Sequence, residues 1–332
     1  MRVAIFDTNP QEQEYIKNHL AGVEVSFFTE KLSQDTVNLA ADAEGISVFI
    51  DSQVTKDVLV KLPKLKFIAT RSTGFDHIDL GFCRERKITV SNVPHYGHNS
   101  VAEHAFALIL NFSRNLYESI ERTKQGSFSF EGLTGFDLNG KTLGVIGLGN
   151  IGQHVVRIAR GFEMQVLGYD VAQDKKLAKR LGFTYASLED LLKNSDIVTL
   201  HAPYSGKTRH LLNAQNMPLM KKGSYLINTA RGGLVDTTAL MAALENGTLA
   251  GAGLDVLEEE NFLKEEAELL SRESSEHYNL KTVLQDHMLL RKKNVMITPH
   301  NAFNSKESLE KILETTVLNI QAFANKKPIN QV

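Results

Sequence analysis

The sequence predicts an α/β fold made of two doubly wound parallel-sheet domains. Three observations lead to this expectation. Short apolar runs alternate with polar, helix-compatible stretches up to about residue 95, and again after residue 140. The second series opens on a glycine-rich turn at residues 147–152, of the kind that joins a strand to a helix in a nucleotide-binding sheet. A chain of 332 residues also suits two domains better than one.

The first series predicts a smaller, flavodoxin-like domain. Its apolar runs are short and largely β-branched or aromatic, as expected of strands buried in a parallel sheet. Strands are expected over residues 2–6, 23–28, 47–50, 66–70 and 88–91. Helices are expected between them, over residues 11–20, 55–60 and 79–85.

The second series is more regular and predicts a complete dinucleotide-binding domain of the Rossmann type. Its strands are expected over residues 142–146, 165–169, 196–200, 224–228, 251–254 and 295–298. Residues 261–293 form a Glu- and Lys-rich, helix-compatible insertion, which we interpret as a solvated surface excursion. Alternatively, the insertion helps to close a cleft or contacts a partner chain.

Two long helices fix the expected domain boundaries. One runs from Ser100 to about Ile120, with Ser100 as N-cap and Glu103 completing a capping box. The other, over residues 305–323, follows the last strand and is expected to return to the first domain. We therefore expect a discontinuous substrate-binding domain over residues 1–99 and 302–332, with an NAD-binding domain over residues 100–301 inserted into it and the cleft between them.

Composition and charge exclude several classes of function. The net charge of −2 at pH 7 provides no basic field for nucleic acid or an anionic membrane. No apolar stretch approaches the length of a membrane span, and the first residues lack the features of a signal peptide. Cys83 is the only cysteine, which excludes an intrachain disulfide. We expect a cytoplasmic protein that acts on a small molecule and holds no metal.

The glycine-rich turn is expected to bind the pyrophosphate of a dinucleotide. Gly147 permits the tight turn, Gly149 lets the phosphates approach the backbone, and Gly152 lets the helix pack closely on the strand. The helix that begins at Asn150 and Ile151 directs its first amides and its dipole at the phosphates.

Asp170 ends the strand that follows this helix. A carboxylate at that place can hydrogen-bond both hydroxyls of the ribose and would repel the 2′-phosphate of NADP. The sequence therefore predicts NAD as the cofactor.

Arg231, Glu260 and His300 each follow a later strand of the second series. The carboxyl ends of parallel strands meet at one edge of the sheet, so we expect these side chains to lie together beside the nucleotide. A guanidinium can bind a carboxylate with two parallel hydrogen bonds. A carboxylate beside an imidazole stabilises the protonated ring, which can then donate its proton. Together they predict a hydride transfer coupled to a proton transfer.

These motifs resemble those of the D-2-hydroxyacid dehydrogenase family over nearly the whole chain. The resemblance is densest between Gly144 and His300, in the stretches 147–152, 228–236, 253–260 and 298–300. It implies that Arg231 binds the substrate carboxylate, that His300 is the acid/base, and that Glu260 orients His300.

The resemblance also implies further contacts of the cofactor and the substrate. Asp255 is expected near the nicotinamide carboxamide. The other residues expected to line the cofactor are Ala202, Pro203, Thr208, Thr229 and Ala230. The residues expected to contact the substrate are Thr73 and Gly74, through their amides, together with Tyr96 and Phe303.

Within the family, Tyr96, Phe303 and the long insertion resemble the D-lactate dehydrogenase branch. This implies a reversible reduction of a 2-oxo acid by NADH, with pyruvate as the expected substrate and D-lactate as the product. One alternative is the same reaction on a bulkier, branched or aromatic 2-oxo acid. Another is a non-catalytic NAD-sensing scaffold, because corepressors share this fold and these residues. The apolar helix at residues 101–110, through which the family commonly pairs, predicts a homodimer.

Overall fold

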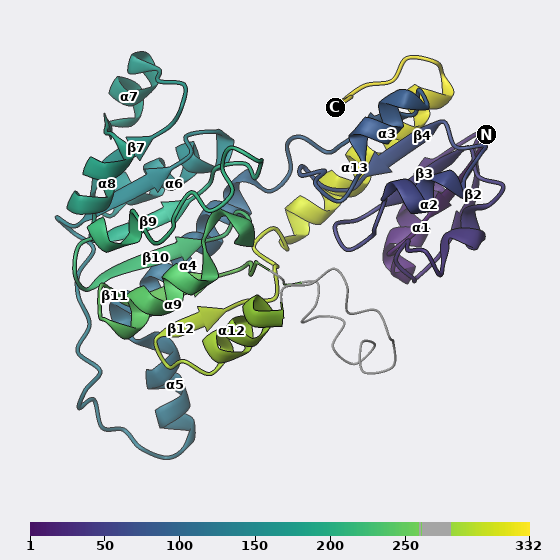
Figure 1. Cartoon of the computed structure of the whole chain (residues 1–332). Coiled ribbons are helices and arrows are strands. Elements are labelled where there is room, and N and C mark those ends of the chain that lie inside the picture. Colours follow the sequence, from purple (N-terminus) through teal and green to yellow (C-terminus); the bar gives the residue numbers. More distant parts are fainter. Residues whose placement is uncertain (259, 261–279) are drawn as a thin grey trace. The chain divides into compact units, whose positions relative to one another are not determined.

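The computed structural model describes residues 1–258, 260 and 280–332, which fall into two units (Figure 1). Unit 1 comprises Met1–Tyr96 and Asn304–Val332, and unit 2 comprises Gly97–Phe303. Each unit is built on one parallel sheet covered by helices. The expected fold class, two parallel-sheet α/β domains, is therefore confirmed.

The sheet of unit 1 has five parallel strands in the order β2-β1-β3-β4-β5, which is the flavodoxin order. They are β1 (Arg2–Ile5), β2 (Glu24–Phe27), β3 (Gly45–Val48), β4 (Phe67–Thr70) and β5 (Thr89–Ser91). Every residue of β3 and β4 is buried. Such continuous apolar runs are expected of a parallel sheet that is covered on both faces.

Unit 1 has five described helices, one of which is a 3-10 helix. They are α1 (Pro10–His19), η1 (Val37–Ala40), α2 (Lys56–Val60), α3 (Leu80–Glu85) and α13 (Lys306–Ala324). Asn9 and Glu12 form a capping box at the start of α1, and Ser305 caps α13. The apolar face of α13 packs against β1 and β4, where Phe323 stacks on Phe67 with 4.4 Å between ring centroids.

The sheet of unit 2 has seven parallel strands in the order β12-β11-β10-β9-β6-β7-β8. They are β6 (Thr142–Ile146), β7 (Gln165–Tyr169), β8 (Thr184–Tyr185), β9 (Ile197–Leu200), β10 (Ser224–Asn228), β11 (Leu249–Leu254) and β12 (Val295–Ile297). The order reverses between β6 and β9, and ligands of doubly wound folds bind at such a point. The edge strand β8 was not predicted, because two residues are too few to show a periodic pattern.

Helices cover both faces of this sheet (Figure 1). The described helices of unit 2 are α4 (His98–Arg114), α5 (Leu116–Lys124), α6 (Asn150–Gly161), α7 (Lys175–Leu181), α8 (Leu188–Asn194), η2 (Met217–Leu219), η3 (Gly232–Leu234), α9 (Thr237–Glu245) and α12 (Leu280–Leu290). Apart from α12, the insertion predicted at residues 261–293 lies largely outside the described residues. Each described helix is too short or too polar to cross a membrane.

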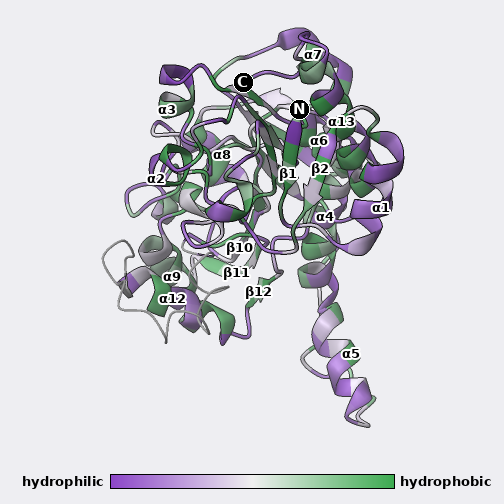
Figure 2. Cartoon of the chain, turned by 90° about the vertical axis from the view of Figure 1, so that its right-hand side faces the viewer, coloured by the Kyte–Doolittle hydropathy of each residue, from purple (hydrophilic) through white to green (hydrophobic). Residues whose placement is uncertain are grey.

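The prediction of one helix from Ser100 to Ile120 was wrong in two respects. Its N-cap is Gly97, and the Ser100 hydroxyl donates to the Gly97 carbonyl instead of capping an amide. The helix also breaks at Asn115, which adopts a left-handed conformation at φ 47°. The Asn115 side chain stabilises this break by donating to the carbonyls of Leu133 and Thr134 at 3.2 Å. As a result α5 is a separate helix, which projects from the rest of unit 2 (Figure 2).

Candidate active site

Two of the three glycines in the turn between β6 and α6 have no room for a side chain. Gly147 has φ 94°, and a Cβ there would lie 2.6 Å from the backbone nitrogen of Ala202. A Cβ on Gly152 would lie 2.0 Å from the Gly147 carbonyl oxygen. At Gly149, by contrast, a Cβ would meet nothing within 4 Å. The tip of the turn, followed by the first amides of Asn150 and Ile151, is therefore open to a ligand.

The Asp170 carboxylate lies at the end of β7 beside this turn. One oxygen accepts the amide of Leu148 at 2.7 Å, and the other accepts the amide of Ala172 at 3.0 Å. Each oxygen keeps a lone pair for a further donor such as a ribose hydroxyl. The open tip and the fixed carboxylate fit a dinucleotide.

The other residues expected to line the cofactor follow β9 and β10. Thr208 closes the first of these loops, because its hydroxyl donates to the Pro203 carbonyl at 2.7 Å. Ala202 lies against Gly147. After β10, Ala230 precedes the arginine turn, and the buried Thr229 hydroxyl has no hydrogen-bond partner among the described residues. An unpaired buried hydroxyl is rare and suits a site that a ligand completes.

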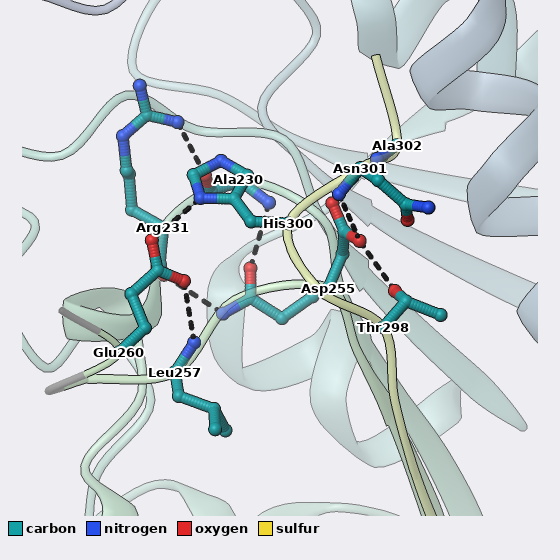
Figure 3. A network of polar contacts seen from close by, with 10 residues as sticks. Ala230, Arg231, Asp255, Leu257, Glu260, Thr298, His300, Asn301 and Ala302 are labelled. Atoms are coloured by element: carbon teal, nitrogen blue, oxygen red, sulfur yellow. Dashed lines mark hydrogen bonds and ion pairs between the residues drawn. The ribbon is translucent and has the colours of Figure 1, made fainter. Parts of the chain in front are cut away.

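Arg231, Glu260 and His300 lie together beyond the ends of β10, β11 and β12 (Figure 3). The turn before Arg231 is held by Asn228, whose side chain accepts the Ala230 amide at 3.0 Å and donates to the Arg231 carbonyl at 2.9 Å. The Arg231 guanidinium donates to the Ala230 carbonyl at 2.7 Å. The structure thus brings together the cation, the carboxylate and the imidazole that the sequence predicted.

His300 and Glu260 form a close pair. His300 Nδ1 lies 2.6 Å from Glu260 Oε1, and the two side chains are 14% and 23% exposed. The other Glu260 oxygen accepts the Leu257 amide at 3.3 Å. A carboxylate on Nδ1 fixes the proton on that nitrogen, orients the ring and leaves Nε2 for chemistry.

His300 itself adopts a left-handed backbone conformation with φ 53°, which is uncommon for a residue other than glycine. Its amide donates to the Thr298 carbonyl at 2.9 Å across Pro299. This tight turn places the ring beside Glu260.

Asp255, which is 1% exposed, holds the turn that carries His300. Its carboxylate accepts the Thr298 hydroxyl at 2.5 Å and the amides of Asn301 and Ala302 at 3.0 and 2.9 Å. The Thr298 hydroxyl has a single proton and gives it to Asp255, so the 3.0 Å contact with His104 Nε2 needs a proton on that nitrogen. Asp255 thus has an anchoring role that the resemblance did not suggest.

In unit 1, the residues expected to contact the substrate lie after β4 and β5. The Thr73 side chain donates to the Val93 carbonyl at 2.8 Å, and Asn92 donates to the Thr73 carbonyl at 2.9 Å. Neither the Thr73 amide nor the Gly74 amide meets an acceptor in the described part of the chain. These two donors are therefore available to a ligand. Tyr96 follows β5 and is half-buried.

Phe303, the other residue expected to contact the substrate, belongs to unit 2. It follows the His300 turn and lies close to Gly97, where an added Cβ would be 3.6 Å from its own Cβ. Phe303 is half-buried.

Arg71, just before the Thr73 loop, is a residue whose role the sequence did not reveal. It is 1% exposed and donates to the carbonyls of Phe6 and Asp7 at 2.8 and 2.7 Å. The guanidinium thereby joins the start of the Thr73 loop to the end of β1. Its place directly after an apolar strand was the only signal in the sequence.

Residues 1–258, 260 and 280–332 contain no cluster of His, Cys, Asp or Glu side chains that could hold a metal ion.

A nucleotide-binding sheet that presents a guanidinium and an imidazole–carboxylate pair defines an oxidoreductase of the NAD-dependent dehydrogenase class.

Comparisons with known proteins agree with this class. Residues 106–302 match the model of the D-isomer specific 2-hydroxyacid dehydrogenase, NAD binding domain. D-lactate dehydrogenase of Escherichia coli is 35% identical over 327 residues, which cover 96% of each chain. An aromatic 2-oxoacid reductase of Clostridium sporogenes is 33% identical over 332 residues, which cover 97% of this chain and 96% of that protein. The structure of D-lactate dehydrogenase from Aquifex aeolicus, complexed with NAD and lactic acid, has a TM-score of 0.89 at 40% identity, covering 98% of this chain and 96% of that one.

The chain belongs to the D-isomer specific 2-hydroxyacid dehydrogenase family. It is an NAD-dependent dehydrogenase of 2-hydroxy acids.

Proposed function

We propose that this enzyme reversibly reduces pyruvate to D-lactate with NADH. The observation that carries the proposal is the 2.6 Å contact between His300 and Glu260 beside Arg231. A proton donor and a carboxylate-binding cation at one edge of the sheet suit a 2-oxo acid, which carries a carboxylate next to the carbonyl to be reduced.

Bound NADH supplies the hydride, and the other tasks fall to side chains of the protein. His300 Nε2 gives a proton to the carbonyl oxygen as the alkoxide forms, and takes it back in the reverse direction. Glu260 keeps the ring oriented through its contact with Nδ1. Arg231 binds the carboxylate and polarises the adjacent carbonyl.

The substrate side of the proposal also draws on unit 1. The amides of Thr73 and Gly74 are available donors, which suits them to the same carboxylate. Tyr96 and Phe303 border the substrate side chain, as the resemblance implies. We propose that the side chain of the 2-oxo acid is a methyl group, as in pyruvate. A branched or aromatic side chain is the alternative, because a relative is an aromatic 2-oxoacid reductase.

On the cofactor side, the turn from Gly147 to Gly152 holds the pyrophosphate and Asp170 holds the ribose. Thr229, with its unpaired hydroxyl, and the Thr208 loop line the same face of the cofactor. Asp255 stabilises the nicotinamide end indirectly, by fixing the His300 turn.

The test is the oxidation of NADH, followed by its absorbance, with pyruvate beside 2-oxoisocaproate and phenylpyruvate, and with NADPH in place of NADH. We expect the highest kcat/KM with pyruvate and NADH, and D-lactate as the product in a stereospecific assay. A preference for phenylpyruvate would keep the reaction and change the substrate. An enzyme that binds NADH and turns over no 2-oxo acid would be a sensing scaffold.

We further propose that the enzyme is a cytoplasmic homodimer. The expected pairing helix, α4, buries Ala105, Phe106 and Ile109 in the core of unit 2, so it offers little apolar surface of its own. The segment after α5 offers more, since Phe128 and Phe130 are 84% and 86% exposed. Light scattering should give twice the chain mass, and a Phe128→Ser, Phe130→Ser variant should give the mass of one chain.

A further inference from the structure

Two glutamates of the loop after β11, Glu258 and Glu260, each pair with an imidazole. Glu260 pairs with His300, as described above. Two residues earlier, Glu258 Oε1 lies 2.5 Å from His210 Nε2, with side chains 14% and 30% exposed. The second pair takes no part in the proposed reaction, so its presence in the same loop calls for a separate explanation.

The Glu258 carboxylate joins three segments of the chain. His210 comes from the loop between β9 and β10. The other Glu258 oxygen accepts the Thr237 hydroxyl at 2.9 Å and the Thr237 amide at 3.3 Å, at the start of α9. Thr237 ends the segment that begins with Arg231. We call His210, Thr237 and Glu258 the Glu258 junction.

The backbone around His210 strengthens the same connection. His210 has φ 48°, and its amide donates to the Gly233 carbonyl at 2.8 Å. Two residues further on, Leu212 pairs with Val235 as an isolated parallel bridge. The His210 loop is therefore bound along the segment that follows Arg231.

At Gly232, the Arg231 turn packs directly against the loop that leads to Glu260. A Cβ at Gly232 would lie 2.0 Å from the carbonyl of Leu257 and 2.4 Å from the amide of Glu258. Because the backbones are this close, a shift of the peptide between Leu257 and Glu258 must also move Gly232, the residue next to Arg231. The position of Glu258 is thus coupled to both the guanidinium and the carboxylate of the active site.

We propose that the Glu258 junction positions Arg231 and Glu260, and that His210 serves it as a hydrogen-bond donor. The neutral ring, protonated on Nε2, can fill this role, because the carboxylate needs one donor from it. Glu258 and His210 are positioning residues, since they act through the turn of Arg231 and the loop of Glu260. This inference rests on the proposed 2-oxo acid reduction.

The test compares His210→Leu, which removes the donor, with His210→Gln, which keeps a side-chain amide donor. For His210→Leu we expect kcat/KM for the 2-oxo acid to fall by about tenfold to a hundredfold, the loss typical of catalytic groups displaced by about 1 Å. The loss should appear in both kcat and KM of the acid, with the Kd of NADH within about twofold of wild type. His210→Gln should recover most of the activity.

A double-mutant cycle with Glu258→Ala separates the pair from its neighbours. If His210 acts through Glu258, the double variant should be no worse than Glu258→Ala alone. Glu189→Gln is the matched control, because Glu189 forms an exposed pair with Lys193 on α8, far from the site in the sequence. It should have wild-type kinetics.

Three results would overturn the inference while the wild type reduces 2-oxo acids. One is unchanged kinetics in His210→Leu. The second is a loss that lies wholly in the Kd of NADH, which would assign His210 to the cofactor loop. The third is an equal loss in His210→Gln and His210→Leu that parallels a lower melting temperature, which would make the residue merely structural. A wild type inactive on every 2-oxo acid would instead contradict the proposed function.

Discussion

Each unit buries a charged side chain directly after a strand of its sheet, and the two charges are opposite in sign. In unit 1, Arg71 follows β4 and donates to carbonyls at the end of β1. In unit 2, Asp255 follows β11 and accepts amides and a hydroxyl from residues 298–302. Both side chains are 1% exposed.

The sign of the charge decides which backbone groups remain for a ligand. A buried guanidinium uses carbonyl oxygens and leaves the nearby amides of Thr73 and Gly74 available, which suits an anion. A buried carboxylate uses the amides of its turn, which leaves the side chain of His300 as the group that this turn presents. The proposed function therefore uses backbone donors of unit 1 and side chains of unit 2.

The largest effect should come from removing the imidazole of unit 2. His300→Asn should lower kcat by about 10³-fold, within the range usual for loss of a general acid. Asparagine tolerates the left-handed backbone of this position, so the turn should survive. Steady-state kinetics and NADH titration should show lost turnover with retained cofactor binding. Turnover within a few-fold of wild type would remove His300 from the reaction.

The next largest effect should come from the cation. Arg231→Gln should raise the KM of the 2-oxo acid by about a hundredfold, the equivalent of about 3 kcal/mol for a lost charge-assisted contact. The Kd of NADH should remain near its wild-type value in a fluorescence titration. Loss of NADH binding together with turnover would contradict the role of Arg231 in holding the substrate.

The two buried charges themselves should give different kinetic signatures. Arg71→Met leaves the Phe6 and Asp7 carbonyls without their donor and should lower the free energy of unfolding by about 2–4 kcal/mol. Because Arg71 fixes the Thr73 loop, the KM of the acid should rise while kcat changes less. Asp255→Asn weakens the His300 turn and should lower kcat instead. Denaturant unfolding and steady-state kinetics of both variants test this contrast. If the same kinetic parameter changed in both variants, the contrast would be wrong.

The last effect concerns the stability of the fold in acid. Burial of the ring lowers the pKa of His201 to about 3, below its ordinary value of 6.5. Between these two pH values the unfolded chain binds a proton at His201 that the folded chain does not bind. The stability from this residue is therefore present above pH 6.5 and is lost as the pH falls towards 3. The slope is at most about 1.4 kcal/mol per pH unit.

Asp7 in unit 1 should act in the opposite direction. Burial raises its pKa above 3.8, although the Ser52 hydrogen bond and Arg71 oppose the shift. Its carboxyl therefore contributes stability below pH 3.8, which is lost as the pH rises through the folded-state pKa. Unfolding free energies measured between pH 3 and 7 should depend less on pH in His201→Leu, and Asp7→Asn should remove the opposite contribution. Identical profiles in the wild type and both variants would contradict these two assignments.

The sequence predicted the sheets and the grouping of the candidate catalytic residues because both leave local signals. Buried parallel strands are continuous apolar runs, and the Gly147–Gly152 turn needs glycine where a Cβ would strike the backbone. Arg231, Glu260 and His300 were singled out as candidates because each follows such a run. Their grouping then follows from the geometry of parallel strands.

The remaining features depend on partners distant in the sequence. The break at Asn115 depends on the carbonyls of Leu133 and Thr134, so the apolar pattern alone indicated one continuous helix. The pairing of Glu258 with His210 joins residues on two loops, and a run of glutamates gave no hint of it. The partners of Arg71 and Asp255 likewise follow from the fold and not from any motif.

The apolar packing of α13 has a consequence for the order of folding. Its Leu313, Val317 and Ile320 cover a face of the sheet of unit 1 that includes Ile5 and Phe67. All of unit 2 lies between these residues along the chain. During synthesis, this face stays without its helix until residues 306–324 emerge from the ribosome, by which time unit 2 has already been made. Unit 1 therefore begins synthesis first and completes its folding last.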